Sequence, residues 1–195
     1  ARTLLLERGL SATSINQIAK RAELSVGAIY FYYRNKEELF AALQVEGLGL
    51  LSRTIRRAAS VKAAPDEKIR NIAQAYWRFS DKQKNYFDVV NYFLSSPEPI
   101  FSPDLKKQVD ERGNESLLIL ADVIATGIRD GVFRDLDPKR QAVVLWGALH
   151  GMIQLKKLDK TILSAENHHS LYREAVERFL DALRRPEQEA VPPAP

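Results

Sequence analysis

The sequence contains no cysteine among its 195 residues, and only one methionine and three histidines. A chain without cysteine cannot form disulfides, bind zinc through thiolates or use a thiol nucleophile. No apolar run approaches the roughly 18 residues that a membrane-spanning helix requires, and the first residues lack the charged-then-apolar pattern of a signal peptide. We therefore expect a cytoplasmic protein with no membrane association.

The residues that commonly carry catalysis are also scarce. The few histidines are not accompanied by a recognisable set of hydroxyl and acid groups, so no nucleophilic or acid–base site is indicated. His168 and His169 are adjacent, but neighbouring residues on a helix point about 100° apart. Because no acid or histidine cluster accompanies this pair, we predict no metal site, no cofactor and no enzyme.

Helical periodicity runs through almost the whole chain, and no β-like alternation of useful length interrupts it. The pattern predicts helices over residues 36–59, 66–82, 86–95, 104–130, 139–157 and 169–185. Pro97, Pro99 and Pro103 break the pattern, and Ile100 and Phe101 are expected to pack back as an apolar plug. The tail 186–195 is rich in proline and lacks large apolar groups, which predicts disorder. We predict an all-α fold.

The stretch 13–36 contains two short helical patterns joined by a tight connection. Thr13 or Ser14 supplies a capping oxygen for the first pattern, which ends near Arg21. Its apolar face consists of Ile15, Ile18 and Ala19. Ser25 can cap the second pattern, which ends near Tyr32. Two helices joined by three or four residues have the helix-turn-helix shape, whose second helix can enter a major groove.

The second of these helices has an aromatic outer surface. Ile29 and Tyr33 lie one turn apart and suit the core. The remaining positions are then distributed over the outer face and the helix ends: Val26, Gly27, Ala28, Tyr30, Phe31 and Tyr32. A helix cannot bury all of the consecutive YFYY aromatics, so some must face outward. A binding surface is favoured over the alternative, an aromatic core patch.

These residue types suit contact with a nucleic acid. Gly27 and Ala28 have almost no side chain, so the backbone there can approach another surface closely. Tyr30 and Tyr32 carry hydroxyls suited to phosphate oxygens, and Lys36 adds a positive charge where the next helix begins.

The positive charge of the chain is confined to its first 57 residues. They contain nine lysines and arginines against five acids, whereas the remaining residues carry twenty of each sign. The whole net charge of +4 therefore accompanies the helix-turn-helix pattern, as a phosphate-binding domain requires.

The run TSINQIAKRAxxSVGAIYxYYRNKEEL, within residues 8–39, resembles the DNA-binding signature of the TetR family of transcriptional regulators. The resemblance implies that Thr13 and Ser14 start the supporting helix, with Ser14 on a phosphate. Residues 25–28 match the front of the recognition helix, and residues 30–32 match its groove-facing end. Lys36 matches the phosphate-binding lysine of the next helix. The partner implied is double-stranded DNA.

The chain departs from this family pattern at three positions. Glu23 stands where the family usually has glycine, Ala28 where a hydroxyl residue is common, and Val26 where a basic or polar residue is common. Direct readout of base edges by hydrogen bonds is therefore reduced. The family's first helix is also longer than the segment before Gly9, so we expect the native start to be missing.

We expect three regions: a helix-turn-helix domain at 1–45, an effector-binding and dimerisation domain at 46–185, and the tail 186–195. By the resemblance, the helix that begins at Lys36 moves when effector binds. Gly47 and Gly49 within it indicate either close packing or a soft point. A small apolar or aromatic effector would fit the residues that could line a cavity in the larger domain: Tyr76, Phe79, Phe87, Val90, Phe93, Leu120, Ile124, Trp146 and His150.

The last two helices indicate self-association. Residues 139–157 are apolar nearly all round, so burial on several sides is expected, and Gly147, Ala148 and Gly151 would let another helix approach closely. A two-fold interface with the helix 169–185 would suit a homodimer on a palindromic operator; the alternative is that both helices belong to the monomer core. We predict a ligand-responsive regulator that acts as a repressor, with a helical protein-interaction module or a helical enzyme as alternatives.

Overall fold

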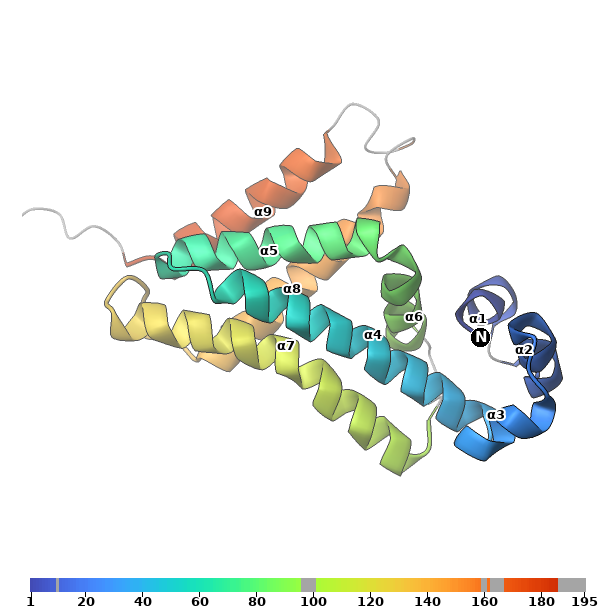
Figure 1. The fold of residues 1–195 in the computed structure, drawn as a ribbon. Helices are drawn as coiled ribbons and strands as arrows, with labels where there is room; N and C mark the ends of the chain where they lie inside the picture. The colour runs from blue at the N-terminus through green and yellow to red at the C-terminus, as the bar shows by residue number, and fades with distance from the viewer. Residues whose placement is uncertain (10, 96–100, 159–160, 162–166, 186–195) are drawn as a thin grey trace, which may run out of the picture. The chain divides into compact units, whose positions relative to one another are not determined.

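The computed structural model describes residues 1–9, 11–95, 101–158, 161 and 167–185. Within them the chain is built from helices (Figure 1): α1 (Arg2–Arg8), α2 (Ile15–Ala22), α3 (Val26–Tyr32), α4 (Lys36–Ala59), α5 (Pro65–Lys82), α6 (Lys84–Leu94), α7 (Pro103–Arg129), α8 (Pro138–Leu155), the 3₁₀ turn η1 (Lys156–Leu158) and α9 (His168–Leu183). The all-α prediction is confirmed.

Two further observations concern the same described residues. An isolated bridge between Phe133 and Arg184 is the one β-type pairing found there. No helix among them combines the length and apolar character needed to cross a membrane. The predicted disorder of 186–195 and the predicted roles of Pro97, Pro99 and Ile100 lie outside the described residues.

The helices form two compact units. The first contains residues 1–56 and 75–116, and the second contains residues 57–74 and 117–195. The predicted domain boundary at residue 45 stays a prediction.

The core of the first unit joins the helix-turn-helix to α6. Its buried members are Leu4, Leu5, Ile15, Ile18, Ala19, Ile29, Leu39, Phe40 and Val89. Val89 belongs to α6 and is completely buried, and Phe101 packs against the same cluster, as the plug prediction required. The Arg2 guanidinium also lies 4.0 Å above the centre of the Tyr86 ring in α6. The helix-turn-helix is thus stabilised by residues far along the chain.

The two glycines of α4 pack closely against neighbours. A Cβ added at Gly47 would lie 3.3 Å from Val90 Cγ2, and one added at Gly49 would lie 2.9 Å from Arg112 Nε. The Ser52 hydroxyl one turn beyond the glycines donates a 2.8 Å hydrogen bond to Glu115 in α7. Close packing, the first of the two interpretations, therefore accounts for Gly47, whereas the neighbour of Gly49 is the movable end of the Arg112 side chain.

In the second unit a tight turn follows α7. Gly131 has a φ of +73°, and the completely buried Phe133 folds back so that its ring covers Gly127, leaving no room there for a Cβ. The Arg134 amide then donates a 2.9 Å hydrogen bond to the Leu183 carbonyl. This loop therefore fastens the end of α9 to α7.

An ion-pair network fastens α5 to α9 in the same unit. Arg70 donates from Nε and Nη2 to the two carboxylate oxygens of Glu177, at 2.8 and 2.9 Å. These hydrogen bonds hold the pKa of Glu177 below its ordinary value. Burial would raise the pKa of Asp66, but hydrogen bonds from Arg70 and Arg184 more than offset it.

Candidate nucleic-acid interface

Serine side chains fix the starts of both helices of the predicted helix-turn-helix. Ser14 Oγ accepts a 3.3 Å hydrogen bond from the Gln17 amide, and Gln17 Oε1 accepts a 3.0 Å bond from the Ser14 amide. This reciprocal capping box orders the first turn of α2. Ser25 Oγ accepts a 3.1 Å bond from the Ala28 amide at the start of α3. Each hydroxyl that accepts a bond in this way can still donate its own proton to a phosphate oxygen.

The turn between α2 and α3 depends on a left-handed residue. Glu23 has a φ of 56° and a ψ of 35°, and the Leu24 amide bonds back to the Ala19 carbonyl at 3.0 Å. Glycine usually occupies such a position because it has no Cβ to clash. The geometry therefore explains why glycine is common here in the family and identifies Glu23 as a strained substitute.

The α3 helix turns one apolar face inward and exposes the rest. Ile29 is buried at 5% exposure, and Tyr33, the residue that ends the helix, packs half-buried against the same core. Val26 also packs there half-buried. The sequence prediction for Ile29 and Tyr33 is thus confirmed, while Val26 lies nearer the core than the predicted outer face.

The aromatic side chains that follow lie on the outside. The exposed fractions are 52% for Tyr30, 81% for Phe31 and 74% for Tyr32. The rings of Phe31 and Tyr32 meet edge to face, with centroids 5.1 Å apart. Gly27 is exposed and Ala28 half-exposed on the preceding turn. The protomer therefore presents a contiguous surface of small and aromatic groups on α3.

Thr13 requires a correction, because its side chain is only 1% exposed. Its hydroxyl contacts two backbone carbonyls, Leu4 at 3.2 Å and Gly9 at 2.7 Å. The side chain joins the end of α1 to the start of α2 and cannot reach a phosphate. Ser14, which is exposed beside it, keeps the predicted position for a phosphate contact.

The start of α4 is ordered by a cap at Asn35. Asn35 Oδ1 accepts a 2.8 Å hydrogen bond from the Glu38 amide. The Glu38 carboxylate accepts a 2.6 Å hydrogen bond from the Arg34 amide and pairs with the Arg34 guanidinium at 3.6 Å. The cap places Lys36, which is half-buried, in the first turn of α4.

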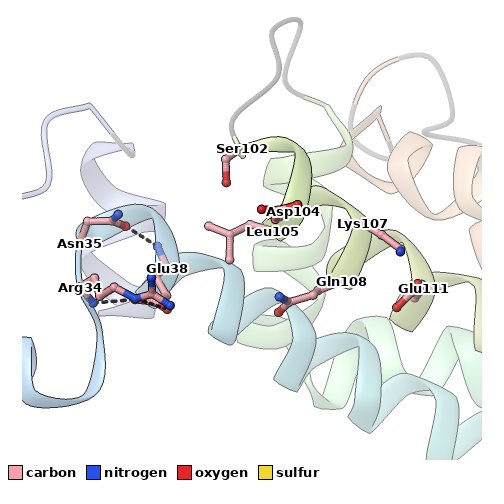
Figure 2. A pocket seen from close by; sticks show the side chains of 9 residues that line it. All are labelled: Arg34, Asn35, Glu38, Ser102, Asp104, Leu105, Lys107, Gln108 and Glu111. Carbon is pink, nitrogen blue, oxygen red and sulfur yellow. Dashed lines mark hydrogen bonds and ion pairs between the residues drawn. The ribbon is translucent and has the colours of Figure 1, made fainter.

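A pocket of about 570 Å³ lies beside this cap (Figure 2), between residues 34–38 and the first turns of α7. Its lining is polar: Arg34, Asn35, Glu38, Ser102, Asp104, Leu105, Lys107, Gln108 and Glu111. The Ser102 amide also donates a hydrogen bond to Glu37 on α4. The lining includes both cationic and anionic side chains, so the pocket favours no ligand of one charge, and it contains none of the predicted effector residues.

The predicted effector residues divide between the two units. In the first unit Tyr76, Phe79, Phe87 and Val90 are buried, and the rings of Tyr76 and Phe87 have centroids 6.0 Å apart. Phe93 is half-buried and stacks on Phe101 with centroids 4.6 Å apart. Burial raises the pKa of Tyr76.

In the second unit Leu120 and Ile124 are completely buried, while Trp146 and His150 are half-buried. Burial lowers the pKa of His150, which favours the neutral imidazole. The effector pocket stays a prediction.

The adjacent histidines His168 and His169 contact different helices. His168 Nε2 lies 2.6 Å from the Met152 carbonyl, and His169 Nε2 lies 3.3 Å from Gln74 Oε1. In the described residues no group of three or more potential ligands is arranged to hold a metal ion.

One face of α8 remains uncovered in the protomer. The helix buries Ala142, Leu145, Leu149 and Ile153. Its opposite side exposes an apolar strip, hereafter the α8 strip, at intervals of one turn: Val143, Val144, Gly147, Ala148, Gly151 and Leu155. The exposed fractions of Val143 and Val144 are 57% and 55%. The close helix packing expected at Gly147 and Gly151 is not present within the protomer, because an added Cβ at either would meet no described atom within 4 Å.

Comparison with known proteins identifies the family. The sequence model described as "Bacterial regulatory proteins, tetR family" matches residues 1–43, and "Tetracyclin repressor-like, C-terminal domain" matches residues 62–154. The chain belongs to the TetR family. It is therefore a ligand-responsive transcriptional regulator that binds DNA, and not an enzyme.

Two curated proteins are similar to this chain in sequence. The HTH-type transcriptional repressor KstR2 of Mycobacterium tuberculosis is 28% identical over 138 residues, which are 70% of this chain and 68% of that protein. The fatty acid metabolism regulator protein of Bacillus subtilis is 23% identical over 147 residues, or 75% and 74% of the two chains. The matched segments therefore cover more than two thirds of each relative.

Solved structures confirm the fold. The transcriptional regulator FadR from Bacillus subtilis, crystallised with stearoyl-CoA, superimposes with a TM-score of 0.78 at 20% identity, covering 94% of this chain and 96% of its own. PfmR from Thermus thermophilus gives a TM-score of 0.73 at 23% identity, with the same coverage.

Proposed function

We propose that this TetR-family regulator is a homodimeric repressor that binds a palindromic operator in the bacterial cytoplasm and is released by an apolar acyl-type effector. The observation that carries the DNA-binding part is the exposed aromatic surface of α3. It lies in the segment that matches the family's DNA-binding region, and the first 57 residues, which include this segment, carry the net positive charge of the chain.

The DNA contacts follow from the side chains that α2, α3 and α4 present. Ser14 and Ser25 donate their hydroxyl protons to phosphates at the two helix starts. The hydroxyls of Tyr30 and Tyr32, both largely exposed, donate to phosphates along the groove, and Lys36 supplies charge at the start of α4. Gly27 and Ala28 allow the α3 backbone to come close to the bases.

A second copy of the chain is the proposed cover for the α8 strip. Exposed apolar side chains at one-turn intervals along a whole helix indicate a partner helix. Leu171, Ala175 and Phe179 of α9 are half-buried and follow the same spacing. A two-fold contact of α8 and α9 would bury both rows, and it would hold two α3 helices at the separation that a palindromic site demands.

The effector class is proposed from the similar regulators. FadR of Bacillus subtilis has been solved with stearoyl-CoA, and the aromatic and aliphatic residues of this chain suit an acyl chain: Tyr76, Phe79, Phe87, Val90, Phe93, Leu120, Ile124, Trp146 and His150. Release from DNA requires that effector and operator favour different conformations of the dimer, and it does not require that they share a site.

The DNA-binding assignment is tested by measuring how two variants bind a palindromic duplex that the protein has selected from a randomised pool. Tyr30→Phe removes one phosphate hydrogen bond per protomer and should weaken binding roughly tenfold for the dimer, at about 0.7 kcal/mol each. Lys36→Ala should reduce the slope of log affinity against log salt by about 2, one unit per protomer. Lys62→Ala, an exposed lysine outside the matched DNA-binding region, is the control and should change neither. Unchanged affinity in both test variants would show that α3 docks differently.

The effector assignment is tested with stearoyl-CoA, free coenzyme A and stearate as separate probes. Stearoyl-CoA should release the protein from its operator at micromolar concentration, while coenzyme A should not. If none of the three probes changes operator affinity or thermal stability, the acyl-type effector is wrong, whereas the DNA-binding assignment is unaffected.

A further inference from the structure

The outermost residues of α3 are Gly27 and Phe31. With Ile29 as the buried reference and about 100° per residue, these two lie at about 160° and 200°, opposite the core and one turn apart. Ala28 and Tyr30 flank them. Exposure agrees with this geometry, since Phe31 is 81% exposed while Ile29 is 5% exposed. The centre of the surface that faces a groove is therefore a glycine followed by a phenyl ring.

The α3 helix contains none of the side chains that usually read base edges by hydrogen bonds. Its seven residues, VGAIYFY, include no amine, guanidinium, amide or carboxylate. Guanine is usually read by Arg or Lys, adenine by Asn or Gln, and cytosine by Glu or Asp. What remains in the major groove for an apolar side chain is the C5-methyl group of thymine.

The local geometry suits contact with such a methyl group. A Cβ added at Gly27 would meet only Ser25 Oγ, at 3.9 Å. The helix surface one turn before Phe31 therefore carries no side chain and is not covered by its neighbours. The Phe31 ring leans against Tyr32 edge to face, which restricts its orientation. When a phenyl group this exposed packs on a methyl group, apolar surface is removed from water. This removal makes the packing favourable.

We propose that Phe31, with Gly27 and Ala28 beside it, specifies the operator by contacting thymine methyl groups. This inference rests on the proposed DNA-binding function and names the base chemistry that the α3 surface recognises. The tyrosine hydroxyls and Lys36 then position the helix on the phosphates, while the apolar centre selects sequence.

The test uses the full chain and a palindromic duplex selected by it from a randomised pool. Each thymine of the half-site is replaced in turn by deoxyuridine, at both symmetric positions, which removes only the methyl group. At one or two positions the substitution should weaken binding about fourfold per methyl group, the factor expected for one buried group of that size. Phe31→Ala should abolish the thymine–uracil difference at one of these positions. Phe31→Leu, which keeps an apolar side chain, should retain it.

The outcomes separate this inference from the function on which it rests. Tight, salt-dependent binding of the selected duplex with no effect of any uracil would overturn methyl recognition and leave the DNA-binding function intact. A thymine–uracil difference that persists unchanged in Phe31→Ala would overturn the role of Phe31. Failure to select any duplex would overturn the proposed function itself.

Discussion

Replacing both Gly147 and Gly151 by alanine should stabilise the isolated protomer and weaken the dimer. Both glycines lie inside α8 and have open space where a Cβ would be added. Each substitution should therefore gain about 1 kcal/mol of helix stability in the protomer. In a two-fold contact of α8 with its copy, the same change introduces four methyl groups where two backbones meet. An added methyl group in a close-packed contact costs at least about 1 kcal/mol. Four of them should therefore weaken the dimer by about 4 kcal/mol, which raises its dissociation constant roughly a thousandfold.

Two measurements distinguish the expected weakening of the dimer from the expected stabilisation of the protomer. Sedimentation equilibrium gives the dissociation constant of the dimer. Urea unfolding over a concentration series should show a midpoint that rises with concentration for the native sequence, because association stabilises the folded state. The double variant should lose this dependence and, at the lowest concentration, unfold at a higher urea concentration than the native sequence.

Gly113→Ala is the matched control within α7. Its added Cβ would meet the Leu48 methyl groups at 3.8 and 3.9 Å, which is ordinary contact, so helix stability should rise without any change in dimer affinity. An unchanged dimer dissociation constant in the Gly147 and Gly151 double variant would refute the proposed α8 contact. A lower protomer stability would refute the conclusion that the space beside these glycines is open.

Three further changes should give measurable effects. Gly127→Ala should lower the free energy of unfolding by about 1–3 kcal/mol, because the new Cβ overlaps the Phe133 ring; calorimetry beside Gly113→Ala, which should stabilise, checks this. Glu23→Gly should raise stability by about 0.5–1 kcal/mol by relieving the left-handed strain, and an unchanged thermal midpoint would contradict it. Glu177→Gln should reduce the loss of unfolding free energy between about pH 6 and about pH 3. The pKa of Glu177 is lowered in the folded state, so its carboxylate stabilises the fold above the ordinary pKa of 4.5, and this stabilisation is lost as the pH falls. An unfolding free energy that falls equally with pH in the variant and the native sequence would exclude this contribution.

Local patterns were sufficient to predict the helices and the buried faces of α2, α3 and α5. The buried residues of α5 are those that the helical repeat of 3.6 residues places on one side: Ile69, Ile72, Ala73, Tyr76 and Phe79. Caps were predictable for the same reason, since Asp137 before Pro138 accepts from two amides in the first turn of α8. Such features depend on residues within one or two turns of each other.

Apart from the packing of Phe101, features that depend on contacts between distant segments were not predicted. Leu94 lies one turn after the buried Val90, a spacing that favours the apolar side of α6, but its side chain is 63% exposed. No local sequence pattern shows that the Thr13 hydroxyl is buried and donates a hydrogen bond to the Leu4 carbonyl. Nor does the pattern of α6 reveal that Val89 completes the helix-turn-helix core. The Ser14–Gln17 capping box, by contrast, has a recognisable spacing, and reading it would have defined the start of α2 more closely.

The place of Val89 in that core bears on how regulators of this kind can be recombined. A fragment that ends after the helix-turn-helix would lack Val89 and the half-buried Phe93 and Phe101 that pack on the same cluster, and would leave the apolar sides of α1 and α4 in water. A chimera that takes its operator specificity from this chain must therefore inherit the start of α4, α6 and the segment just before α7 along with α1 to α3. New operator specificity is more simply acquired by replacing exposed residues such as Phe31, which contribute nothing to that shared core.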